Sequence, residues 1–122
     1  MESILVSIKK MLGITEEYEH FDADLIMHIN SVLMILNQIG VGPSRGFSIK
    51  GEDEVWADFI PDDSQLELVK SYMHLKVKLL FDPPLGSAVI EVMNRQIQEF
   101  EWRLSVAVDP GESKGERRIQ NE

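Results

Sequence analysis

Apolar residues recur at helical spacing in four separate runs along the chain. These runs predict helices over Ile4–Leu12, over Asp22–Ile39, from just after Asp62-Asp63-Ser64 to Phe81, and over Ser87–Val106. Gly13 and Gly40 follow the first two runs, and glycine is the residue that most easily ends a helix. Pro83 and Pro84 cannot continue the third. The pattern therefore predicts an all-α protein, a small bundle of about four helices.

Two segments lack helical periodicity. Residues 40–63 form a long irregular loop that opens with turn-forming Gly40-Val41-Gly42-Pro43, with room for one helical turn at Val55–Phe59 and a short extended piece at Phe47–Ile49. After Asp109-Pro110-Gly111 the sequence is polar to its end, which predicts a flexible tail. We expect one domain, residues 1–108, and a disordered tail, residues 109–122.

The predicted helix over residues 22–39 has two unlike sides. One is an apolar stripe that suits the core. The other carries no charge and consists of Met27, Asn30, Ser31, Met34, Asn37 and Gln38. A side that only meets water normally bears charged residues, whereas methionines and short polar residues suit an adaptable contact. Two interpretations stay open: a contact with another subunit, and coverage by loop 40–63.

Several large side chains are candidates for contacts with a partner protein: Phe47, Trp56, Phe59 and Trp102. Trp102 points away from the apolar stripe of the last predicted helix, so either the tail or a loop covers it, or it anchors another chain. Lys9 and Lys10 are expected to lie off the apolar face of the first helix. Lys76 falls within the apolar arc of the third, where we expect its ammonium to reach water or to pair with one carboxylate.

The charge of the chain restricts its partners. It has 21 acidic and 12 basic residues in 122, a net charge of −9, and therefore lacks the basic surface with which proteins grip nucleic acid. The chain has no cysteine, which excludes disulfides and thiolate chemistry.

Leu25–Ser44 is uncharged and about as long as a membrane span, but five polar side chains interrupt it and Gly40, Gly42 and Pro43 end its helix. We expect no contact with a membrane.

No motif for catalysis or for a cofactor is present. His20, His28 and His74 are too scattered to form a ligand pair on one helix, and the acidic residues lack the spacing of a calcium loop. There is no phosphate-binding glycine loop followed by lysine, and no Gly-x-Ser-x-Gly. We therefore expect no catalytic residue, no metal and no cofactor, and a protein that is not an enzyme.

Several segments, in order, resemble the head–tail connector (adaptor) proteins of tailed bacteriophages, which are also labelled phage DNA-packaging proteins. The segments are Phe21-Asp22-Ala23-Asp24, Met27-His28-Ile29-Asn30-Ser31, Asn37-Gln38-Ile39-Gly40-Val41-Gly42-Pro43, Gly46-Phe47, Trp56 with Asp58-Phe59, Lys76-Val77-Lys78-Leu79-Leu80-Phe81-Asp82-Pro83-Pro84, and Glu99-Phe100-Glu101-Trp102-Arg103-Leu104. They cover about residues 3–106, and none is chemically diagnostic alone.

The resemblance implies a structural virion protein located in the neck, at the head–tail interface, and in the host cytoplasm during assembly. Such a protein forms a homo-oligomeric ring matching the symmetry of the portal protein and docks on the portal after DNA packaging. The ring extends the DNA channel and offers a platform for the next neck or tail-completion protein. Double-stranded DNA passes through it without specific binding.

The acidic residues gain a possible meaning from this resemblance. Residues 52–63 hold six acids and no base, and Glu52, Asp53, Glu54, Asp62 and Asp63 are candidates for a channel lining that repels DNA phosphates. Residues 16–24 hold five more acids, also without a base. The alternative function is a small acidic cytoplasmic helical regulator, antitoxin-like or a DNA mimic, that binds a host protein.

Overall fold

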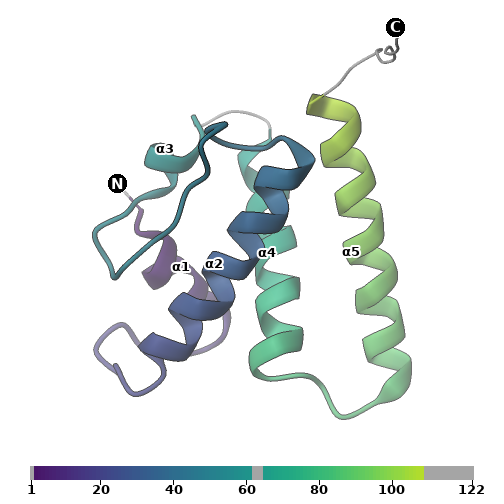
Figure 1. Ribbon diagram of the computed structural model, residues 1–122. Coiled ribbons are helices and arrows are strands. Elements are labelled where there is room, and N and C mark those ends of the chain that lie inside the picture. Colours follow the sequence, from purple (N-terminus) through teal and green to yellow (C-terminus); the bar gives the residue numbers. More distant parts are fainter. Residues whose placement is uncertain (1, 62–64, 109–122) are drawn as a thin grey trace, which may run out of the picture.

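The computed structural model describes residues 2–61 and 65–108 and shows five helices in that part of the chain (Figure 1). They are α1 (Ile4–Met11), α2 (Asp22–Ile39), α3 (Trp56–Phe59), α4 (Leu66–Phe81) and α5 (Ser87–Val108). The only β pairing among the described residues is an isolated bridge between Ser3 and Val55. The all-α prediction is confirmed. The expected tail, residues 109–122, lies outside the described residues.

The helix ends follow local sequence signals. Helix α2 has the predicted bounds, and Gly40 ends it in the left-handed conformation at φ 107°, where a side chain would be strained. Helix α1 ends one residue earlier than expected, with Leu12 as its C-cap. Helix α5 continues two residues further than expected, to Val108. The second of these two residues packs on the end of α2, since a Cβ built on Gly40 would lie 2.7 Å from Val108 Cγ1.

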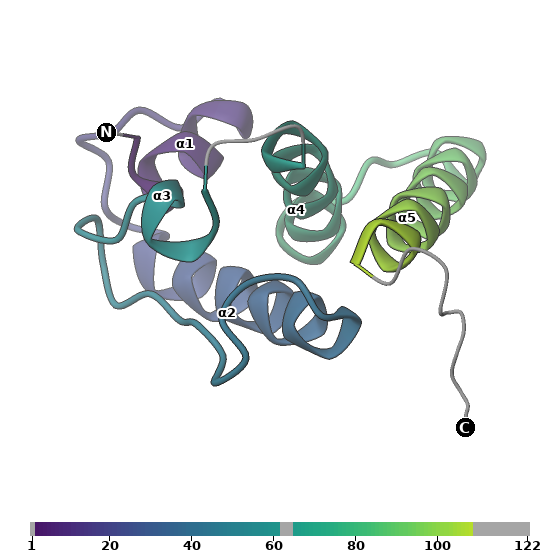
Figure 2. The same ribbon diagram turned by 90° about the horizontal axis from the view of Figure 1, so that it is seen from above.

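Helix α4 is the centre of the bundle. Seen from above, it lies between α1 and α5, with α2 across from it (Figure 2). Five of its side chains are buried, whereas the much longer α5 buries only Ile97 and Leu104. Most of the surface of α5 is therefore left for solvent or for another protein.

Loop 40–55 and α3 are fixed to the N-terminal part of the chain. The indole Nε1 of Trp56 donates a 2.8 Å hydrogen bond to Ser7 Oγ on α1, in the interior. Its backbone N–H donates to Glu2 O at 3.1 Å, and Ile4 N–H donates to Glu54 O at 3.0 Å. Phe59 packs against Gly42, where a Cβ would lie only 2.4 Å from its ring. The short helical turn expected at residues 55–59 is thus α3, which buries Trp56 and Phe59.

Lys9 holds the connector between α1 and α2, residues 13–21. Its side chain is fully buried, with Nζ 2.9 Å from Asp22 Oδ1 and donating to the backbone oxygen of Glu16 at 2.9 Å. The expectation that Lys9 leaves the apolar face is wrong, because the connector folds over the end of α1 and encloses it. Lys10 is exposed, as expected.

A second buried polar contact joins α4 to α5. The hydroxyl of Tyr72 donates a 2.7 Å hydrogen bond to Glu101 Oε2. Burial, and after it the hydrogen bond and charge of Glu101, raises the pKa of the Tyr72 hydroxyl, so the group stays protonated and remains a donor. The contact fixes the register of the two antiparallel helices.

Candidate interaction surface

The uncharged side of α2 divides into two parts. Asn30 and Asn37 lie beneath loop 40–49: the Asn30 amide donates to Ile49 O at 3.0 Å and accepts from Ile49 N–H at 2.8 Å. Asn37 Nδ2 donates to Pro43 O at 3.0 Å. These amides satisfy the backbone of a loop that forms no strand among the described residues. Coverage by the loop is therefore correct for this part.

The rest of that side is exposed. Met27, Ser31, Met34 and Gln38 follow each other at spacings of four, three and four residues, which places them in one line along α2. We call this line the α2 stripe. Met27 is 59% and Met34 61% exposed, and no charged residue interrupts the stripe. Exposed methionines on an uncharged helix surface are typical of a protein contact.

The aromatic candidates lie in different environments. Trp56 and Phe59 are 3% and 4% exposed and belong to the core, and Phe47 is half-buried against Phe59 with ring centroids 5.4 Å apart. In this chain these three rings hold the loop in place. Trp102 of α5 is 64% exposed and borders a shallow hollow together with Leu68 of α4 and Val106. Of the four candidates, it presents most of its ring to a partner.

The acidic candidates also differ. Glu52 and Asp53 are exposed at the tip of the loop. The Glu54 carboxylate accepts from the N–H groups of Lys50 at 2.9 Å and Gly51 at 3.4 Å, so it stabilises the turn. Asp62 and Asp63 lie outside the described residues.

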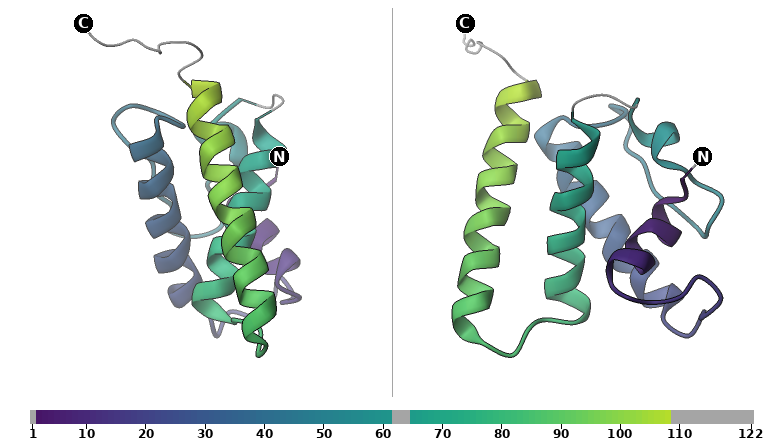
Figure 3. Two further views of the ribbon diagram at one scale, coloured as in Figure 1. Left: turned by 90° about the vertical axis from the view of Figure 1, so that its right-hand side faces the viewer. Right: turned by 180° about the vertical axis from the view of Figure 1, so that it is seen from behind.

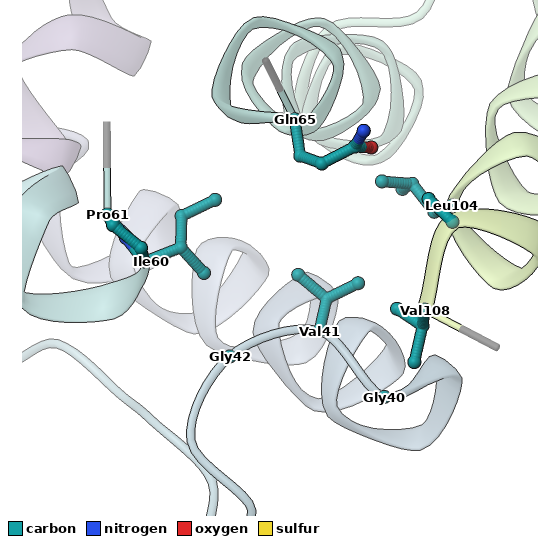
Figure 4. Close-up of a pocket in the computed structure, with 9 residues that line it drawn as sticks. Gly40, Val41, Gly42, Ile60, Pro61, Gln65, Leu104 and Val108 are labelled. Atoms are coloured by element: carbon teal, nitrogen blue, oxygen red, sulfur yellow. The ribbon is translucent and has the colours of Figure 1, made fainter. Parts of the chain in front are cut away.

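An apolar cavity of about 170 Å³ lies between the ends of α2 and α5 (Figure 4). Val41, Ile60, Leu104 and Val108 point into it, and Gln65 contributes an amide. None of the described residues that line it has a titratable side chain. It offers space for an aliphatic group.

The described residues hold no group of three or more histidine, cysteine or acidic side chains that could bind a metal ion. Burial, and after it the charge of Lys78, lowers the pKa of His74, which is therefore neutral at neutral pH. None of the helices in the described part combines the length and the apolar run needed to cross a bilayer.

Comparison with known proteins identifies the family. A sequence model described as "Phage connector protein" matches residues 4–111, which include every described helix. Searches of curated proteins and of solved structures found no match. Because the family match spans most of the chain, the protein belongs to the phage connector protein family.

Proposed function

We propose that this chain forms a homo-oligomeric ring in the virion neck, docks on the portal after DNA packaging, extends the DNA channel and carries the next neck or tail-completion protein. The family is a structural, non-enzymatic kind of protein and suggests a location in the neck. The observation that supports self-assembly is the α2 stripe, an exposed and uncharged line of side chains on an otherwise acidic protein.

The α2 stripe suits a contact between subunits for a physical reason. Desolvating methionine costs little, whereas desolvating a charge costs several kcal/mol unless it is paired. The stripe lies opposite the buried residues Leu25, Ile29 and Leu36, so a second protein can cover it without disturbing the core. A ring needs two different patches on each subunit, and this stripe is proposed as one of them.

Replacing both Met27 and Met34 with lysine should prevent ring formation without unfolding the chain, because both side chains are exposed in the monomer. Light scattering and negative-stain microscopy of the protein, alone and with its portal, measure the effect. Met11→Lys on α1, at a methionine that is 39% exposed, is the control and should assemble normally.

Rings of the double variant equal to those of the wild type would contradict this use of the stripe. A wild-type chain that stays single in the presence of the portal and captures a host protein would instead favour the acidic regulator. Portal and tail genes on either side of the gene for this protein would favour the function in the phage neck.

We also propose that the acidic tip of loop 40–63 faces the channel. Glu52 and Asp53 are exposed, and the turn that carries them is fixed by Glu54. Negative charge close to the path of DNA repels phosphates over the ~8 Å screening length of physiological salt. With Asp62 and Asp63 it would form a lining past which a duplex slides.

Reversing Glu52 and Asp53 to lysine should slow DNA ejection, because each new ammonium attracts phosphate. Raising the salt concentration should remove the delay, since salt weakens such contacts. Ejection from reconstituted particles, followed by DNA release, measures the effect. The control, Glu91→Lys/Glu99→Lys on α5, changes the net charge equally. Equal ejection rates for wild type and the loop variant would contradict the lining.

A further inference from the structure

We propose that the acidic connector of one copy, residues 13–21, docks on Lys76 and Leu80 of a second copy, and that this is a head-to-tail contact of the ring. The inference rests on the proposed function. It supplies a partner for a basic side chain that pairs with no other residue in the described part of the chain.

Lys76 stands apart from the other basic residues that the structure describes. It is half-buried, yet it makes no hydrogen bond or ion pair with another described residue. The other half-buried or buried lysines, Lys9, Lys70 and Lys78, each pair with a carboxylate within 3.0 Å. A half-buried lysine covers its aliphatic stem and keeps its ammonium accessible, so a carboxylate brought to Lys76 would form a favourable ion pair.

The neighbouring helix cannot supply that carboxylate. Tyr72 meets Glu101, and because α4 and α5 are antiparallel, the position one turn later on α4 lies across from an earlier turn of α5. Residues 92–98 of α5 contain no acid. One further turn along α4, Leu80 is 53% exposed. The receiving surface is thus a cation beside an aliphatic side chain.

The connector has the complementary chemistry. Glu16, Glu17 and Glu19 are exposed, and no described residue pairs with their carboxylates. Tyr18, between them in sequence, is 49% exposed and lies 5.7 Å from the Phe21 ring. Lys9 donates a hydrogen bond to the backbone of the connector from inside the protein, so the acidic residues and the Tyr18 ring of the connector are preorganised for binding.

The distribution of charge favours a contact between two unlike patches over one between two connectors. Residues 2–61 carry ten acids and four bases, whereas residues 65–108 carry five of each. Two connectors facing each other would repel. The connector lies on the side of the molecule away from α5, whereas Lys76 belongs to the central helix α4, so a copy offers two different patches (Figure 3). Such a contact can close into a ring.

Cross-linking tests the contact directly, because the natural chain has no cysteine. A variant with both Glu17→Cys and Lys76→Cys should give a ladder of covalent oligomers when oxidised in assembled rings, alone or on the portal. Glu17→Cys combined with Arg95→Cys, which places the second thiol at an exposed position of α5, is the control and should give no ladder.

A charge exchange provides a second measurement. Lys76→Glu and Glu17→Lys/Glu19→Lys should each raise the concentration needed for assembly about tenfold or more, since like charges then meet. Mixing the two variants should restore assembly, because each contact in an alternating ring again joins opposite charges. Arg45→Glu, at an exposed base of loop 40–55, should have no effect.

The outcomes separate this inference from the function on which it rests. Rings that form without the 17–76 cross-link, or that tolerate Lys76→Glu, would overturn the inference and leave the ring in place. A wild-type chain that remains single even on the portal would overturn both.

Discussion

Trp56→Ala should destabilise the folded chain by about 3–5 kcal/mol, the range for removing a buried tryptophan side chain. Trp56 is 3% exposed, and its indole N–H donates a hydrogen bond to Ser7 Oγ in the interior. The ring of Trp56 also lies 5.8 Å from Lys70 Nζ. Truncation therefore removes apolar contacts and the link between α3 and α1 together. Chemical denaturation followed by circular dichroism measures the free energy of unfolding.

The second tryptophan provides the control. Trp102 is 64% exposed, so Trp102→Ala should change the free energy of unfolding by no more than about 0.5 kcal/mol. If Trp102 contacts a partner, the same variant should weaken binding to the portal or to the next neck protein. Equal destabilisation by the two variants would contradict the division into a core and a surface tryptophan.

The sequence placed most helix ends because their signals are local. Asp22 at the start of α2 and Gly40 at its end act within one turn of the helix. The end of α5 was placed two residues too early, since nothing between Val106 and Val108 stops a helix. Val108 packs closely against Gly40, which is distant in the sequence. Residues 106–108 alone therefore do not indicate where α5 ends.

The side chains that hold the loop were harder to predict. A helical wheel identifies the uncharged side of α2, but it does not distinguish Asn30, which lies beneath the loop, from Ser31, which is exposed. Its residue type and its place in loop 40–63 make Trp56 a candidate for a partner contact, whereas the structure buries it. The residue that points to a buried Trp56 is Ser7. It is a polar residue on the apolar face of α1 and is only 2% exposed, so its hydroxyl needs a hydrogen-bond partner inside the protein.

Lys9→Met should cost about 3 kcal/mol, at the lower end of the range for breaking a buried ion pair. The methionine keeps the length of the buried stem but removes the ammonium that pairs with Asp22 and donates to Glu16 O. Asp22 retains 21% exposure, so water partly solvates the carboxylate left behind and limits the loss. The exposed neighbour Lys10→Met is the matched control and should change the free energy of unfolding by about 0.5 kcal/mol or less.

The same substitution, Lys9→Met, also tests whether the fold of the connector supports assembly. Without its anchor the connector should no longer present Glu17 in a fixed place, so Lys9→Met should lower the yield of the 17–76 cross-link even at temperatures where the chain stays folded. Adding Asp22→Asn should recover part of the lost stability, because an amide leaves no buried charge without a partner. A Lys9→Met variant as stable as Lys10→Met would show that the buried ammonium does not hold the connector, and the preorganised acidic surface would then lose its structural basis.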